Sequence, residues 1–214
     1  MEQGEKMKYI IMCGGPRSDK PLRVIYNEAL AQRTIRLLRE NGITDIAISS
    51  NDDRYRQFGV DVLKHDNFVP EKEYHWLHCF YPAKEPVCYL YGDVFYSPEA
   101  IKTITSFETE DIEFFGSTPP FSPLYTKKWA EPFAFKVQNI ERFFKCIART
   151  LQLNEWHQFE REPISWELWQ VIKNTPINMI DYRNYTAIND YTADIDSDEQ
   201  AEMLCQKIDR GDHE

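Results

Sequence analysis

The first fifty residues contain the pattern of a strand, a helix and a second strand. An apolar run at 8–13 ends at Gly14–Gly15, as expected of a buried strand. Helical periodicity follows over 27–40, with Asn27 as its predicted cap, and residues 44–50 predict the second strand. Such a unit closes as a right-handed crossover onto a parallel sheet. The pattern therefore predicts an α/β fold.

The remainder of the chain continues this alternation. Further strands are predicted at 60–63, 87–94, 111–116 and 132–137, and helices at 98–107, 138–151, 164–172 and 197–208. A stretch rich in Pro and Ser at 116–132 predicts a long loop, and loops of that length in compact domains are often functional. No composition shift marks a linker, so we expect one domain over 8–208, with flexible ends at 1–7 and 209–214.

Charge and cysteine usage exclude several classes of protein. The chain has 214 residues and a net charge of -10, whereas a nucleic-acid groove needs a basic surface. No apolar stretch approaches the length of a transmembrane helix, and the charged N-terminus lacks the apolar core of a signal peptide. Five scattered cysteines then predict reduced thiols. We expect a cytoplasmic protein without a nucleic-acid or membrane partner; its oligomeric state stays open.

The Gly14–Gly15 turn and the two cations after it predict a phosphate site. A glycine turn at the carboxyl end of a first strand lets backbone N–H groups converge on an anion. Ligands of open α/β sheets gather at this edge, where Arg17 and Lys20 would stand over the phosphates. Neither G-x-x-x-x-G-K-[ST] nor G-x-G-x-x-G occurs in the sequence, which leaves a P-loop or a dinucleotide site unsupported.

Four segments in chain order resemble the nucleotidyltransferases with the GT-A-like fold. They are the stretch from IIMCGG through KPLRVIYNEALAQRTIRLL to GITDIAISSND, then CYLYGDVFYSPEAI (88–101), EPFAFKV (131–137) and DYTADIDSDEQAEML (190–204). The resemblance covers most of 8–208. It implies a three-layer Rossmann-like architecture with a mostly parallel mixed sheet.

The resemblance also implies a reaction and the residues for it. A phosphate oxygen of an acceptor attacks the α-phosphorus of a nucleoside triphosphate and pyrophosphate is released. By position in the family's motifs, Asp93 and Asp196 bind Mg²⁺, Lys20 binds the α-phosphate and pyrophosphate oxygens, and Arg17 binds the terminal phosphates. The catalytic set is then Lys20, Arg17 and Asp93. The other expected nucleotide-binding positions are Met12, Cys13, Gly14, Gly15, Asn51 and Gly92.

Each of these residues also has a structural interpretation. A Gly-Asp pair after a strand commonly begins a turn, and acids before Ser197 are typical of a helix N-terminus. Arg17 and Lys20 could belong to a solvated turn. The functional interpretation depends on all of these positions meeting at one edge of one predicted sheet.

The second half of the chain contains the candidate acceptor residues. Glu131, Trp166 and Asp194 are expected to bind the acceptor, and four tryptophans lie in this half: Trp129, Trp156, Trp166 and Trp169. Aromatic rings can enclose a quaternary ammonium, which makes phosphocholine a candidate acceptor. The short single-domain length resembles phosphocholine cytidylyltransferases, and this resemblance favours CTP as the nucleotide. A sugar 1-phosphate and a molybdopterin-type acceptor stay open. Core packing is the alternative role for Trp166 and Trp169, which are three residues apart on a predicted helix.

Three rival hypotheses remain. A glycosyltransferase that uses a nucleotide sugar on the same fold would need D-x-D at the end of a central strand, where 92–95 reads Gly-Asp-Val-Phe. A non-catalytic nucleotide-binding relative would explain why only PRSD separates Gly15 from Lys20, fewer residues than in the family's turn. A zinc site is the third, but its candidate ligands match no closed zinc spacing: His75, His78, Cys79 and Cys88.

Overall fold

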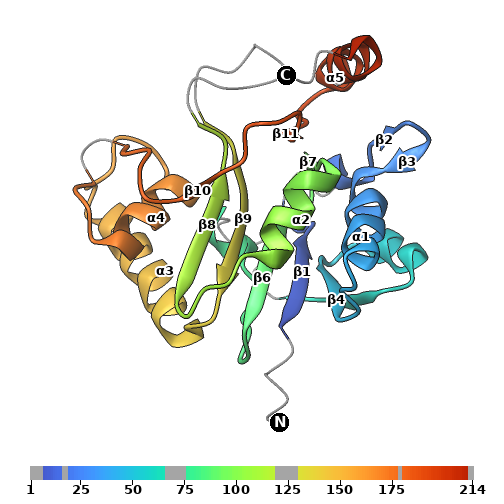
Figure 1. The fold of residues 1–214 in the computed structure, drawn as a ribbon. Coiled ribbons are helices and arrows are strands. Elements are labelled where there is room, and N and C mark those ends of the chain that lie inside the picture. Colours follow the sequence, from blue (N-terminus) through green and yellow to red (C-terminus); the bar gives the residue numbers. More distant parts are fainter. Residues whose placement is uncertain (1–6, 16–18, 66–75, 119–129, 178–179, 212–214) are drawn as a thin grey trace.

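A seven-stranded mixed sheet runs through the protein (Figure 1). The structure is a computed structural model, and it describes residues 7–15, 19–65, 76–118, 130–177 and 180–211. The strands are β1 (Lys8–Met12), β4 (Ile46–Ser49), β5 (Asp61–Leu63), β6 (Val87–Tyr91), β8 (Ile112–Gly116), β9 (Pro132–Val137) and β10 (Thr186–Ala187), in the order β10-β8-β9-β6-β1-β4-β5. Neighbouring strands are parallel, except that β9 is antiparallel to both β6 and β8. The predicted α/β fold with a mostly parallel mixed sheet is confirmed.

Helices and two small ribbons complete the described structure. The helices are α1 (Leu30–Glu40), α2 (Pro98–Ser106), α3 (Ile140–Glu155), α4 (Ser165–Lys173) and α5 (Asp198–Arg210), with short 3₁₀ turns η1 (Lys20–Leu22), η2 (Asp53–Phe58) and η4 (Trp76–Cys79). The ribbons pair β2 (Val24–Ile25) with β3 (Glu28–Ala29), and β7 (Val94–Phe95) with β11 (Ala193–Asp194). No helix within the described ranges is both long and apolar enough to cross a membrane.

The alternation of side chains along β9 separates two helical layers. Phe135 lies on one face, with its ring centroid 5.5 Å from that of Phe143 on α3 and 6.3 Å from that of Trp169 on α4. The next residue, Lys136, reaches the C-terminal end of α2, where it donates hydrogen bonds to three backbone carbonyls. Successive residues of a strand point to opposite faces. The sheet is therefore the middle of three layers.

The beginning of the first helix differs from the prediction. Tyr26 and Asn27 have φ angles of 50° and 63°, which make them the turn of the β2–β3 hairpin. The Leu30 N–H then donates to the Arg23 carbonyl at 3.0 Å, and α1 begins at Leu30. Asn27 as a helix cap was wrong, because asparagine suits both a cap and a left-handed turn and its identity does not separate the two.

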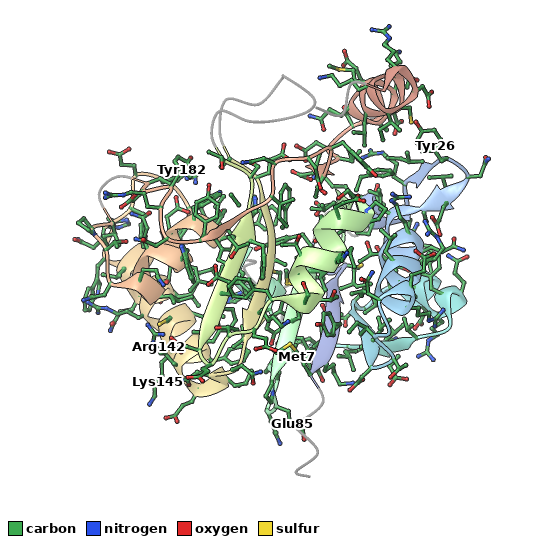
Figure 2. The ribbon with its side chains drawn as sticks, in the orientation of Figure 1. Met7, Tyr26, Glu85, Arg142, Lys145 and Tyr182 are labelled. Atoms are coloured by element: carbon green, nitrogen blue, oxygen red, sulfur yellow. The ribbon has the colours of Figure 1, made fainter. Side chains whose placement is uncertain are left out.

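A second, smaller core fixes the C-terminal segment at the end of the sheet where β1 terminates (Figure 1). Its buried members are Ile25, Leu30, Phe95, Ala193, Ile195, Ala201 and Leu204. Arg23 adds a 2.8 Å hydrogen bond to the Ile195 carbonyl and a 2.8 Å ion pair with Asp198. Tyr26, labelled in Figure 2, donates its hydroxyl to Asp209 at 2.8 Å. These contacts hold α5 through Arg210, two residues beyond the predicted helix end.

Lys136 ties the sheet to α2, and its removal tests this layer. The Lys136 residue is 6% exposed, and its ammonium donates to the carbonyls of Ile104, Thr105 and Phe107 at 3.1, 3.0 and 2.6 Å. Lys136→Met is expected to reduce the free energy of unfolding by about 2–4 kcal/mol, because it leaves these carbonyls without their charged donor. Urea unfolding measures the loss. Lys102→Met, exposed on the same helix, should change it by less than about 0.5 kcal/mol. If Lys136→Met lowered the free energy of unfolding no more than Lys102→Met does, Lys136 would not be the link between the sheet and α2.

Candidate functional site

Three segments that are distant in the sequence meet beyond the end of β1. Lys20 comes from η1, Asp93 from the turn between β6 and β7, and Asp196 from the segment between β11 and α5. The Lys20 ammonium lies 3.5 Å from an Asp93 carboxylate oxygen and donates a hydrogen bond to the Asp196 carboxylate. The Lys20 residue is only 8% exposed. The tertiary structure thus brings together the predicted phosphate-binding lysine and both predicted metal ligands.

Gly92 makes the sharp turn that presents Asp93. A Cβ at this position would lie 2.6 Å from the Met12 carbonyl oxygen and 2.6 Å from the Cys13 sulfur, so no larger residue fits without a shift. The Gly92 N–H donates to that same Met12 carbonyl at 3.0 Å. Three predicted nucleotide-binding positions, Met12, Cys13 and Gly92, are therefore neighbours. Burial raises the pKa of the Cys13 thiol well above its usual range, as expected of a protonated core cysteine.

The remaining nucleotide-binding predictions have different outcomes. Gly14 and Gly15 follow β1, and Gly15 has a φ of 93°, a conformation that favours glycine. Arg17 lies outside the described residues. The Asn51 side chain donates to the His65 carbonyl at 3.0 Å and accepts from the His65 N–H at 2.9 Å. This amide joins two loops, and its contact with a nucleotide base stays a prediction.

Burial and the crowding of carboxyl groups change the acidity of Asp93. Burial, followed by the nearby negative charge of Asp194, raises the pKa of Asp93 to about 7. The Lys20 ammonium acts in the opposite direction, and Asp196 adds to the increase. Carboxyl groups held together in this way gain from a cation that neutralises them.

The donor set fits a magnesium ion that is shared with a substrate. In the part of the chain that the structure describes, no three His, Cys, Asp or Glu side chains form a ready-made metal site. Mg²⁺ in phosphate-transfer sites takes only one or two carboxylates and completes its shell with water and phosphate oxygens. Asp93 and Asp196 meet that requirement because both approach Lys20. Metal binding by this pair stays a prediction.

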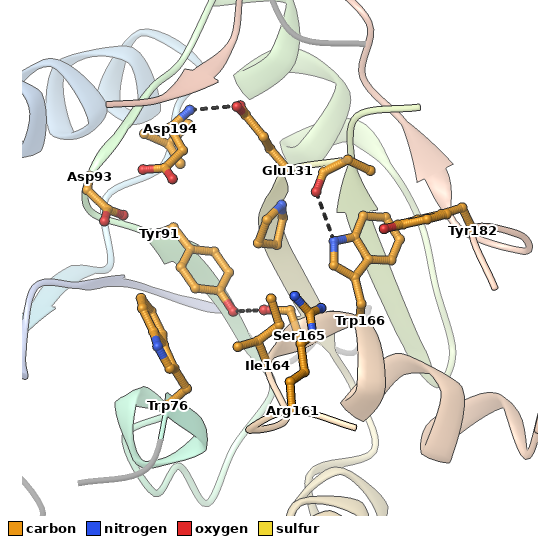
Figure 3. A pocket seen from close by; sticks show the side chains of 13 residues that line it. Trp76, Tyr91, Asp93, Glu131, Arg161, Ile164, Ser165, Trp166, Tyr182 and Asp194 are labelled. Atoms are coloured by element: carbon orange, nitrogen blue, oxygen red, sulfur yellow. Dashed lines mark hydrogen bonds between the residues drawn. The ribbon is translucent and has the colours of Figure 1, made fainter. Parts of the chain in front are cut away.

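A cavity of about 140 Å³ adjoins the carboxylates (Figure 3). The predicted acceptor residues Glu131, Trp166 and Asp194 all line it, together with Asp93. Glu131, 2% exposed, accepts the Asp194 N–H at 3.0 Å. The predicted residues therefore share one cavity, although their contact with an acceptor stays a prediction.

The tryptophans divide between the core and the cavity. Trp166 donates its indole N–H to the Ala130 carbonyl at 3.1 Å, packs edge-on against Phe114 and also lines the cavity. Trp169 is buried in the core. Trp156 is 54% exposed, and Trp129 lies outside the described residues. Trp166 thus packs in the core and also lines the cavity, and its contact with an acceptor stays a prediction.

Sequence reasoning missed several residues that line the cavity. They are Trp76, Tyr91, Val94, Ala130, Pro132, Arg161, Ile164, Ser165 and Tyr182. The Tyr91 and Ser165 hydroxyls share a hydrogen bond, and the Tyr182 ring centroid is 4.7 Å from that of Trp166. Tyr91 directly precedes Gly92 at the end of a predicted strand, which was a usable signal. Val94 and Pro132 begin the strands β7 and β9. The others come from irregular segments, a 3₁₀ turn or a helix start, where periodicity gives no orientation.

Comparison with solved structures reveals the same fold in known nucleotidyltransferases. An inositol-1-phosphate CTP transferase from T. maritima is 15% identical, with 95% of this chain and 97% of that chain covered at a TM-score of 0.52. A putative glucose-1-phosphate thymidylyltransferase from Bacillus anthracis is 14% identical, with 92% and 93% covered and a TM-score of 0.57. A CTP:phosphocholine cytidylyltransferase from Streptococcus pneumoniae is 15% identical, with 95% and 99% covered and a TM-score of 0.52.

These similarities establish the architecture of the chain. No family model matches it, and no curated protein matches it by sequence. The expected resemblance to GT-A-like nucleotidyltransferases is confirmed at the level of the fold, over nearly the whole length of both chains.

The raised pKa of Asp93 has a testable consequence for stability in the absence of metal. The folded protein binds a proton at Asp93 up to about pH 7, whereas the unfolded chain releases it near the ordinary aspartate pKa of 3.8. The contribution of this group to stability therefore falls as the pH rises between these values. The stability that Asp93→Asn gains over wild type is therefore expected to be larger at pH 8 than at pH 5.

Thermal unfolding in chelator-treated buffer measures the difference between wild type and Asp93→Asn. Asp61→Asn, at the exposed start of β5, is the control and should follow wild type at both pH values. An Asp93→Asn curve parallel to that of wild type would contradict the raised pKa.

Proposed function

We propose that this protein is a Mg²⁺-dependent nucleotidyltransferase. It joins the nucleoside monophosphate of a triphosphate, with CTP favoured, to a small phosphorylated metabolite and releases pyrophosphate. The observation that carries the proposal is the Lys20 ammonium between Asp93 and Asp196, beside a cavity of about 140 Å³. The solved structures with this fold support it, because their names describe transfer from CTP and other nucleoside triphosphates.

The chemistry requires positioning and charge neutralisation more than covalent catalysis. A phosphate oxygen of the acceptor forms a bond to the α-phosphorus, and the bond from that phosphorus to the bridging oxygen breaks as pyrophosphate leaves. Lys20 neutralises the charge of the α-phosphate and the departing pyrophosphate. Asp93 and Asp196 would hold Mg²⁺, which when bound supplies further positive charge to the phosphates. The glycine turn lets backbone N–H groups approach them.

The cavity supports phosphocholine as the favoured acceptor. Its walls include Trp76, Tyr91, Trp166 and Tyr182, and carboxylates lie among them. Aromatic faces and carboxylates both attract a quaternary ammonium. One of the structural neighbours is named as a CTP:phosphocholine cytidylyltransferase.

A sugar 1-phosphate is the second candidate acceptor. The hydroxyls of Tyr91 and Ser165 border the same cavity, and hydroxyl groups can hydrogen-bond a polyhydroxy ligand. We further propose that the protein is cytoplasmic, a compartment in which its five free cysteines would stay reduced.

Pyrophosphate release tests the proposal directly. The assay combines Mg²⁺ and each of CTP, UTP, GTP, ATP and dTTP with phosphocholine or several sugar 1-phosphates. Release with one pair identifies the reaction and both substrates. Nucleotide-dependent thermal stabilisation without release would favour the non-catalytic binder. Turnover of a nucleotide sugar in a parallel assay would favour the glycosyltransferase. The absence of both pyrophosphate release and nucleotide-dependent stabilisation would refute the nucleotide site.

Lys20→Ala tests the assignment of the central cation. Loss of the ammonium is expected to lower kcat by about 10²-fold or more, because the transition state loses a preorganised positive charge. Circular dichroism checks that the variant is folded. Lys102→Ala, which removes an exposed lysine of α2, is the control and should keep the wild-type kcat. Wild-type turnover by Lys20→Ala would show that the site is elsewhere.

A further inference from the structure

Arg161 is a charged residue of the cavity that the proposed chemistry does not use. Among the described residues that line the cavity it is the one cation, while Asp93, Glu131 and Asp194 are carboxylates. An anion that enters is repelled by the carboxylates and attracted by Arg161. In the view of Figure 3, Arg161 and Asp93 lie at opposite sides of the cavity. The cavity therefore has a negative side and a side that can accept an anion.

A buried carboxylate holds Arg161 in place. The Arg161 Nε donates to the Oε1 atom of Glu167 at 2.7 Å, and the Oε2 atom of Glu167 accepts the Ile164 N–H at 3.0 Å. Glu167 is 3% exposed and lies in the first turn of α4. Because both of its oxygens are engaged, its position is set by the start of the helix. The orientation of the guanidinium is set in turn.

The outer part of the guanidinium is available to a ligand. Within the described ranges, neither Nη1 nor Nη2 of Arg161 has a hydrogen-bond partner. Figure 3 shows the guanidinium directed into the cavity, toward Ser165 and Trp166. The Arg161 side chain is 49% exposed, so a ligand can reach it from solvent. Two parallel N–H donors of a guanidinium match a phosphate or a carboxylate.

We propose that Arg161 binds an anionic oxygen group of the acceptor, and that Glu167 is its positioning residue. This inference rests on the proposed function in one respect, namely that the cavity receives the acceptor. It adds a specificity rule: ligands without an anionic oxygen group gain nothing from Arg161. The anion is the reacting phosphate of the acceptor or a carboxylate elsewhere in it, and both present the same geometry to the guanidinium.

Two matched ligand series measure this rule by titration calorimetry without nucleotide. Choline, phosphocholine and glycine betaine share a trimethylammonium and differ in carrying no anion, a phosphate or a carboxylate. Glucose, glucose 1-phosphate and glucuronate form the corresponding sugar series. Arg161→Met is expected to weaken binding of the anionic members of at least one series by about tenfold or more, and to leave the neutral members unchanged. Weakening confined to phosphates or to carboxylates identifies which anion Arg161 binds.

Three further variants separate charge, orientation and general damage. Arg161→Lys keeps the charge without the fork and should bind anions with intermediate affinity. Glu167→Gln keeps the charge of Arg161 but weakens its anchor, so anion affinity should fall by about threefold, without a change for CTP. Arg149→Met removes an exposed guanidinium that lies 5.1 Å over the Trp156 ring, outside the cavity, and should match wild type.

The outcomes separate this inference from the proposed function. The role of Arg161 is overturned if Arg161→Met binds the anionic ligands as tightly as wild type does. It is also overturned if the substitution weakens the binding of neutral ligands by the same factor. Absence of anion binding by wild type overturns it also. If Arg161→Met releases pyrophosphate with an unchanged acceptor KM, the inference fails while the function stands. Arg161-dependent anion binding without pyrophosphate release from any triphosphate supports the anion site and refutes the transferase.

Discussion

A buried ammonium among carboxylates is stable only when the charges are close to balanced and well placed. In this protein the ammonium is that of Lys20, which contacts Asp93 and Asp196. The three residues belong to segments separated by as many as 176 positions, so the contact joins the first turn after β1, the end of β6 and the C-terminal segment. The same contact places the candidate phosphate-binding and metal-binding groups together. Local structure and candidate chemistry therefore depend on one cluster of charges.

Backbone geometry, rather than side-chain choice alone, makes this cluster possible. The Gly92 turn fits only because no side chain stands between it and the end of β1. On the other side, Arg23 holds the Ile195 carbonyl and Asp198, which anchors the segment that carries Asp196. The position of each carboxylate is thus set by the backbone segment that carries it: the Gly92 turn for Asp93, and the segment bound by Arg23 for Asp196. Such preorganisation means that little reorganisation is needed when a substrate brings further charge.

The neighbouring cavity has an uneven distribution of charge and polarity. Trp166 is anchored in the core by Ala130 and Phe114 and also lines the cavity. Glu131 supports the backbone of Asp194, and Glu167 supports the guanidinium of Arg161. Buried carboxylates thus act here through the groups that they orient. A rigid wall of this kind favours discrimination between small ligands that differ in one charged group.

The sequence by itself determined the α/β class, the main strands and helices, and the residues that end strands at the carboxyl edge. Apolar periodicity and glycine turns are local signals, and Gly14, Asp93 and Asp196 could be found from them and from the motifs around them. Only the tertiary structure decided that Asn27 forms a hairpin turn, that Lys20 lies between two aspartates, and that Arg161 and Glu131 line one cavity. These features depend on contacts between segments far apart in the chain. Hydrophobic periodicity carries no information on such contacts, because it reports only which face of each element is buried.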